Sequence, residues 1–346
     1  MRFRGLVRAA LALLLWWGML LPRAAALGDG DGFVATLWGP WTREQAFEVN
    51  AMAARAGARQ ISYLVHMRQR DRGASEVRWL GSAPGTPLWA APAAPVLRDA
   101  IADARGRGLA VTLVPFLFAD SGEARQWFWP RDRARWFASY GERMEELAEF
   151  AARHGVSELL VASELSLLYL DEAGWRGVIG RVRARFSGHL TISTLFYEYA
   201  TIRFWDALDS IGVSAYFPLA FWTGIRGTDW LERAWRLHHA HLVAFAAALG
   251  KPITFAEVGY PATHVAAVQP WDYRWAERRL DPELQARCFE ALRRVWSREP
   301  RLRRLSIWGL EPAALDARHS GGKGYLPLGK PAESPVRRLF AERAAP

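Results

Sequence analysis

The chain has 346 residues, of which 51% are hydrophobic, so it can bury a large core as one big barrel or as two ordinary domains. Its formal charge of +10 would favour a nucleic-acid partner if the basic residues formed one run, but they are spread among acidic residues, so we expect no nucleic-acid partner. The 18 Trp and 17 Phe exceed what packing usually requires, and surplus aromatic side chains often line ligand grooves.

The first 26 residues are typical of an export signal. They contain a basic start from Met1 to Arg8, an apolar stretch from Leu11 to Leu21 and small residues at Ala24–Ala26. We therefore expect a signal peptide at 1–26 and one exported domain at 27–346, periplasmic or extracellular and without stable membrane association after cleavage. An uncleaved N-terminal anchor is the alternative, although the apolar stretch is short for a span of about 20 residues.

Beyond this leader, short apolar runs rich in β-branched residues alternate with longer amphipathic stretches, which predicts a parallel sheet covered by helices. The expected strands are 33–38, 60–65, 110–116, 159–162, 190–194, 210–215, 253–256 and 305–308. The expected helices are 44–56, 96–107, 133–154, 173–186, 230–249 and 282–298. Eight strands without a dividing linker predict a single (β/α)8 TIM barrel, and the missing G-x-G-x-x-G turn argues against a doubly wound nucleotide-binding fold.

Two glutamates close apolar strand runs, at the end of the barrel where active sites form. Glu164 follows the run 159–162, and Glu257 follows the run 253–256. The fourth and seventh strands face each other across a barrel mouth, so the two carboxylates can flank one glycosidic bond. A retaining glycoside hydrolase uses such a pair, with one carboxylate as the nucleophile and the other as the acid and then the base.

Several blocks resemble glycoside hydrolase family 113, a β-mannanase-like family, or a close relative among retaining (β/α)8 barrels. They are residues 204–219, 251–260, 266–273, 322–325 and 329–332, which follow in the family's order. The resemblance implies hydrolysis of a β-linked polysaccharide, with Glu164 as acid/base and Glu257 as nucleophile. It implies neither a cofactor nor a metal.

Five aromatic residues are expected to bind substrate. Tyr216 can hydrogen-bond Glu257, and Trp308 can form the floor beneath the reacting sugar; the others are Tyr260, Trp271 and Phe196.

The chain also departs from the family's pattern. It has Ser163 and Ala256 in place of a Thr before each glutamate, and it lacks a His and an Asp after 110–116 and an Asn-Trp after 190–194. Four aromatic residues are candidates for a rebuilt pocket wall: Phe116, Phe118, Trp127 and Trp129.

Two alternatives remain open from the sequence. A non-catalytic barrel that binds polysaccharide for export or modification would explain the altered pocket, and a transglycosylase would use a second sugar in place of water. His238 and His241 are three apart on a helix, but no carboxylate set accompanies them, so we expect no metal site. The lone Cys288 has no disulfide partner and is expected to be buried, and nothing in the sequence requires more than a monomer.

Overall fold

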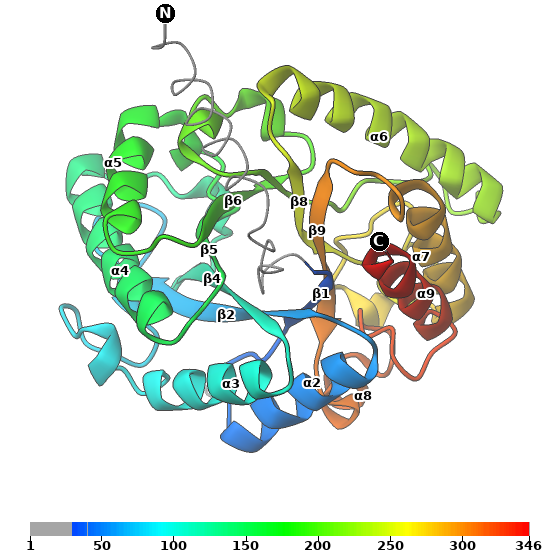
Figure 1. The fold of residues 1–346 in the computed structure, drawn as a ribbon, viewed down its shortest axis with the longest axis horizontal. Helices are drawn as coiled ribbons and strands as arrows, with labels where there is room; N and C mark the ends of the chain where they lie inside the picture. Colours follow the sequence, from blue (N-terminus) through cyan, green and yellow to red (C-terminus); the bar gives the residue numbers. More distant parts are fainter. Residues whose placement is uncertain (1–29, 40, 346) are drawn as a thin grey trace, which may run out of the picture.

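The computed structural model describes residues 30–39 and 41–345 and shows a closed parallel barrel (Figure 1). The chain forms β1 (Gly32–Ala35), β2 (Gln60–Gln69), β4 (Ala110–Ala119), β5 (Glu158–Ser163), β6 (His189–Leu195), β7 (Ile211–Ser214), β8 (Ile253–Val258) and β9 (Leu302–Leu310). Consecutive barrel strands pair in parallel, and β1 pairs with both β2 and β9, which closes the sheet. The predicted (β/α)8 fold is confirmed.

Helices surround this barrel and connect its strands (Figure 1). They are α2 (Arg43–Arg55), α3 (Ala94–Gly106), α4 (Arg133–Arg153), α5 (Glu172–Arg183), α6 (Thr228–Leu249), α7 (Pro282–Trp296), α8 (Ala313–Ser320) and α9 (Glu333–Ala344). The six predicted helices are present within a few residues of their expected ends, whereas α8, α9 and the short strand β3 (Arg78–Trp79) were not predicted. β3 pairs antiparallel with β2 outside the barrel.

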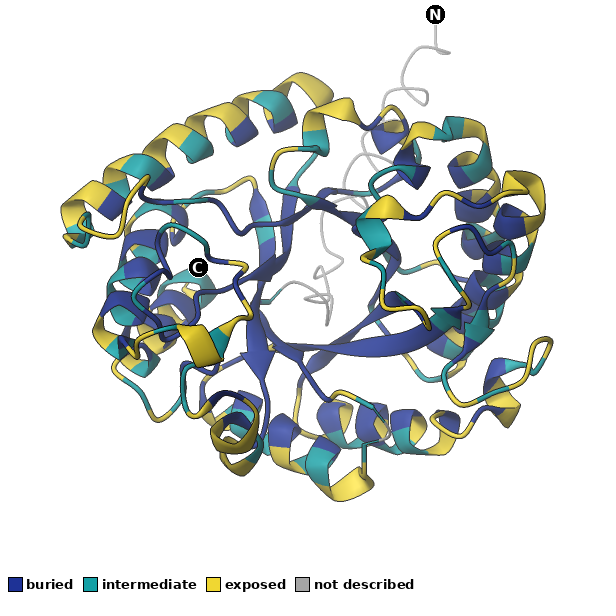
Figure 2. Cartoon of the chain, turned by 180° about the vertical axis from the view of Figure 1, so that it is seen from behind, coloured by how far each residue is buried: buried dark blue, intermediate teal, exposed yellow. Residues whose placement is uncertain are grey.

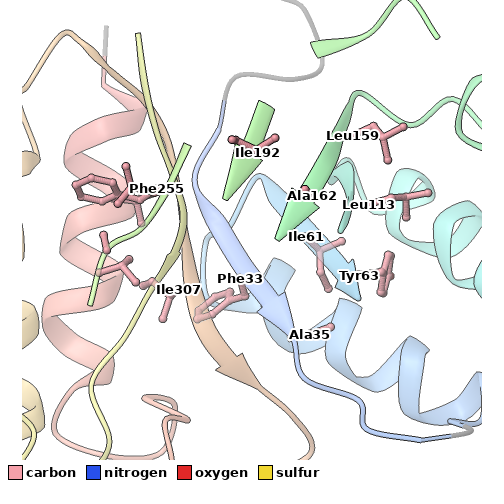
Figure 3. Packing of buried hydrophobic residues seen from close by; sticks show 14 of the residues in the cluster. Phe33, Ala35, Ile61, Tyr63, Leu113, Leu159, Ala162, Ile192, Phe255 and Ile307 are labelled. Atoms are coloured by element: carbon pink, nitrogen blue, oxygen red, sulfur yellow. The ribbon is translucent and has the colours of Figure 1, made fainter. Parts of the chain in front are cut away.

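Side-chain alternation along each strand divides the core into an outer and an inner layer. Phe33 and Tyr63 point outward and pack with the apolar faces of the helices in the main hydrophobic cluster, part of which Figure 3 shows. Val34 and Leu64, their neighbours in sequence, belong to a smaller cluster inside the barrel. The strands are therefore buried on both faces, and exposed residues lie mainly on outer helix surfaces and loops (Figure 2).

The amino-terminal half of the barrel interior is polar. Glu158, at the start of β5, accepts hydrogen bonds from Arg304 Nε at 3.1 Å and Nη2 at 2.7 Å, and from Arg303 Nη1 at 2.7 Å. Burial favours the neutral carboxyl, but the charges of Arg304 and Arg303 outweigh it and lower the pKa of Glu158 to about 2. This ion pair lies in the amino-terminal half of the barrel interior, whereas the site forms at the carboxyl ends of the strands.

The predicted leader at residues 1–26 lies outside the described residues. Among the helices in the described part of the chain, none is long and apolar enough to cross a membrane. Cys288 is buried in α7, as predicted.

Candidate active site

A cavity of about 550 Å³ opens at the carboxyl ends of the barrel strands and contains both predicted glutamates. Glu164 and Glu257 line it together with Arg125, Gln126 and Leu195. Aromatic side chains make up the rest of its lining: Trp38, Phe116, Phe118, Trp127, Phe196, Tyr197, Tyr216, Trp271, Tyr273 and Trp308. The cavity therefore combines an aromatic wall with a buried carboxylate pair, the composition expected of a sugar-binding site.

Glu164 is held by a strained backbone and by two side-chain donors. Its φ of 53° is the only positive φ of a non-glycine residue in the described part of the chain. Its backbone N–H donates to the Ser193 carbonyl at 2.8 Å, which fixes this conformation against β6. Glu164 Oε2 accepts from Arg125 Nη2 at 2.7 Å and from Gln126 Nε2 at 3.0 Å. Such strain is uncommon outside functional sites, because it costs about 1–3 kcal/mol.

Glu257 reaches the cavity because of a bulge in β8. Strict alternation would place Ala256 inside and Glu257 outside the barrel. The pairing of β8 with β7 instead shifts from Val213↔Phe255 to Ser214↔Glu257, so that Ala256 and Glu257 both face inward. Glu257 Oε2 accepts from the Tyr216 hydroxyl at 3.0 Å, the contact expected from the sequence, and Oε1 is buried without a partner among the described residues.

The two carboxylates differ in their electrostatic surroundings. Burial, with the negative charge of Glu164, raises the pKa of Glu257 to about 8, although the Arg125 charge and the Tyr216 hydrogen bond act in the opposite direction. Glu164 instead contacts a guanidinium, with its Oε2 2.7 Å from Arg125 Nη2. Near neutral pH the buried Glu257 therefore favours its protonated form.

Replacing Glu257 with glutamine is expected to stabilise the protein at alkaline pH. Unfolding lets this carboxyl ionise near its ordinary pKa of 4.5, whereas in the folded state it retains its proton until about pH 8. The folded state thus binds more protons between these values, and stability falls as the pH rises through this window. Thermal unfolding should show a Tm gain of a few °C for E257Q that is larger at pH 8.5 than at pH 5. Equal gains at both pH values would contradict the burial argument.

A matched control is Glu164→Gln. This change leaves the partly buried Arg125 guanidinium without its counter-charge, so we expect no comparable gain at pH 8.5.

The aromatic wall contains two groups of neighbouring rings. In one, Phe116 stacks against Trp308 with ring centroids 6.1 Å apart, and Trp38 lies 5.9 Å from Trp308. In the other, Phe196 stacks on the half-exposed Trp271 at 5.6 Å. Sugar rings can stack on such aromatic faces.

Comparison with known families decides the classification. The family model described as Glycoside Hydrolase Family 113 matches residues 33–330. The chain belongs to glycoside hydrolase family 113. Both glutamates and all of the cavity lining lie within the matched region of this family 113 hydrolase.

Solved structures of family 113 share the fold. The β-mannanase from Alicyclobacillus acidocaldarius, in complex with ManMIm, is 25% identical with a TM-score of 0.78, covering 92% of this hydrolase and 99% of that chain. A family 113 β-1,4-mannanase complex is 21% identical with a TM-score of 0.76, covering 91% and 99% of the two chains. No curated protein matches the sequence significantly.

Four of the five aromatic residues predicted to bind substrate line the cavity of this family 113 hydrolase, and Tyr260 does not. Tyr260 is fully buried, its hydroxyl accepts from Trp235 Nε1 at 2.8 Å, and its ring packs edge-on against Phe289. The prediction that Tyr260 contacts substrate is corrected: its side chain packs outside the barrel against the helices.

Among the four candidate wall residues, Phe116, Phe118 and Trp127 line the cavity and Trp129 does not. Trp129 instead lies beneath the guanidinium of Arg133, at 4.7 Å, on the outer surface of the same loop.

Arg125, Gln126, Trp38 and Tyr273 also line the cavity but were not predicted from the sequence. Arg125 and Gln126 belong to the short helix η2 (Arg125–Trp127), which follows β4 and resembles an ordinary surface loop in sequence. Only the position of this loop at the carboxyl end of a barrel strand could have drawn attention to it.

Proposed function

We propose that this enzyme hydrolyses a β-linked, mannan-type polysaccharide with retention of anomeric configuration, with Glu257 as nucleophile and Glu164 as acid/base. The observation that carries the proposal is a single cavity lined by two carboxylates, from the ends of β5 and β8, and by ten aromatic side chains. A purely binding barrel has no need to bury a pair of coupled carboxylates, because their mutual repulsion costs stability.

In the first step, a Glu257 carboxylate oxygen attacks the anomeric carbon as the bond from that carbon to the glycosidic oxygen breaks. The leaving oxygen takes the proton of Glu164, and a glycosyl ester of Glu257 forms. In the second step, Glu164 takes a proton from water, the water oxygen bonds to the anomeric carbon, and the ester bond to Glu257 breaks. Tyr216 orients the Glu257 carboxylate for both steps through its 3.0 Å hydrogen bond.

The competent form of the pair holds one proton. Attack requires that this proton lie on Glu164, because the leaving oxygen has to take it. Positive charge that develops on the sugar ring in the transition state favours the ionised form of Glu257.

Loss of this one proton is expected to produce an alkaline limb in the pH dependence of kcat/KM near pH 8, the pKa of Glu257. Because the charge of Arg125 lowers that pKa, Arg125→Gln should move the limb to higher pH. Initial rates over pH 4–10 at low substrate concentration measure the position of the limb in wild type and its shift in R125Q. A limb that does not move in R125Q would contradict the electrostatic coupling.

Mannan is the proposed substrate class because the two similar family 113 structures are β-mannanases. The leader pattern at residues 1–26 supports action on a polysaccharide in the periplasm or outside the cell. We further propose that the mature enzyme is a monomer without stable membrane association. Cell fractionation and sizing of the mature protein test these points, and a membrane-bound full-length chain would contradict them.

Reducing-end release from mannan, glucomannan, cellulose and xylan tests the proposed activity. Wild type should release reducing ends from at least the mannan-type polymers, and Glu164→Gln and Glu257→Gln should not. A folded wild-type protein that binds these polymers and releases nothing would favour the non-catalytic alternative.

A further inference from the structure

Arg125 occupies a position in the cavity that its contact with Glu164 alone does not explain. Its guanidinium carbon lies 3.9 Å from the centre of the Phe116 ring, and Phe116 stacks against Trp308. The cation is therefore held flat against the wall of rings on which a sugar would bind. Every other side chain that lines the cavity, apart from the two glutamates, is uncharged.

The guanidinium has more hydrogen-bonding capacity than its surroundings use. Arg125 has five N–H donors, and its one hydrogen bond among the described residues runs from Nη2 to Glu164. Nε is buried without an acceptor, and Nη1 makes no hydrogen bond in the described part of the chain. A buried donor without a partner costs about 1–3 kcal/mol, so the empty site lacks an acceptor that a ligand can supply.

The proposed role of Glu164 as an acid also conflicts with its contact with Arg125. A general acid has to donate a proton from a carboxyl oxygen, whereas Glu164 Oε2 is already engaged by Arg125 Nη2 at 2.7 Å. A second anion on Arg125 would share its positive charge and weaken its hold on Glu164. A planar carboxylate fits this position, because it accepts two parallel N–H bonds from one guanidinium.

We infer that Arg125 is a specificity-determining residue that binds a carboxylate on the substrate, so that the preferred polymer carries acidic sugar units beside the cleaved linkage. This inference rests on the proposed hydrolase function and narrows its substrate class to acidic β-linked polysaccharides. The formal net charge agrees with it: of the +10, four charges belong to the leader, so residues 27–346 carry +6. A net positive charge raises the rate at which an anionic polymer meets the site.

The test compares binding of two probes to Glu257→Gln, which cannot form the glycosyl ester. The probes are a β-1,4-linked mannan oligosaccharide and the same oligosaccharide oxidised at C6 to carboxylates. Titration calorimetry should show that the oxidised probe binds about 10- to 100-fold more tightly, the range expected for hydrogen bonds to a charged group. Adding Arg125→Gln should abolish that preference, and Arg125→Lys should restore part of it through charge alone.

Arg68→Gln provides the matched control. Arg68 also lies over a wall ring, 5.8 Å from the centre of Phe118, but it pairs with Asp120 and does not line the cavity. Its removal should leave the preference unchanged, and thermal unfolding checks that each variant is folded.

Equal affinity for the two probes, or an equal loss of both in Arg125→Gln, would overturn the inference. Hydrolysis by the wild-type protein is a separate readout. A preserved, Arg125-dependent preference without hydrolysis of either probe would contradict the proposed function and support the assignment of Arg125. Hydrolysis of both probes at the same rate, with no Arg125-dependent preference, would support the proposed function and contradict the assignment of Arg125.

Discussion

Glu257→Gln is expected to reduce kcat by about 10⁴-fold or more on any substrate, because loss of a nucleophile removes the covalent route altogether. A glutamine at this position can still accept from Tyr216, so the cavity should keep its shape. Because both good and poor leaving groups need the nucleophile, the loss of kcat in E257Q should be the same for both. An aryl glycoside with an acidic phenol and a natural oligosaccharide should be equally poor substrates for E257Q.

Glu164→Gln should behave differently with the same two substrates. An acidic phenol departs without a proton, so formation of the glycosyl ester should remain fast on the aryl glycoside and be strongly slowed on the oligosaccharide. A burst of phenol followed by slow turnover would mark the missing base in the second step. If the selective rescue appeared in E257Q and not in E164Q, the two roles would be reversed.

Glu158→Gln should have the largest effect on stability. The Glu158 carboxylate lies inside the barrel and pairs with the fully buried Arg304. Removing the carboxylate leaves Arg304 there as an unpaired cation. Breaking a buried pair of this kind costs about 3–5 kcal/mol. Urea unfolding of E158Q and wild type at pH 7 measures the loss. The matched control is Glu172→Gln, which breaks a half-exposed pair with Arg176 and should cost less than about 1 kcal/mol.

The same pair predicts an acid dependence with a defined sign. Because the folded pKa of Glu158 is depressed to about 2, its contribution is fully present above the ordinary pKa of 4.5 and is lost as the pH falls toward 2. The stability difference between wild type and E158Q should therefore shrink between pH 4.5 and pH 2. A difference that is constant over this range would show that Glu158 acts through packing and not through charge.

Much of the fold could be predicted because each strand and helix carries its own periodic pattern. Runs such as 159–162 and 253–256 are apolar on both faces, as expected of strands between a core and a helical layer. Glycines mark the ends of several helices, and Gly57 and Gly250 have the positive φ values that a left-handed helix end requires. The helix α8 was missed because it has eight residues and few buried apolar positions.

A site residue could be predicted only where its position after a strand determines its place at the barrel mouth. Glu164 and Glu257 each follow a strand, so their location at the barrel mouth could be predicted, but the bulge that turns Glu257 inward depends on pairing between strands. Tyr260 was misassigned because its direction depends on the same local register. Arg125 lies 39 residues from Glu164 in sequence and meets it only in the folded chain.

The stereochemistry of the first product tests the central claim most directly. Proton NMR of the anomeric signals, recorded within the first minutes of wild-type digestion of a β-1,4-linked mannan oligosaccharide or its C6-oxidised form, separates newly released β-anomers from α-anomers before they equilibrate. Double displacement through Glu257 predicts that the β-anomer appears first. Initial release of the α-anomer would mean that water attacks directly, and it would contradict the assignment of Glu257 as nucleophile.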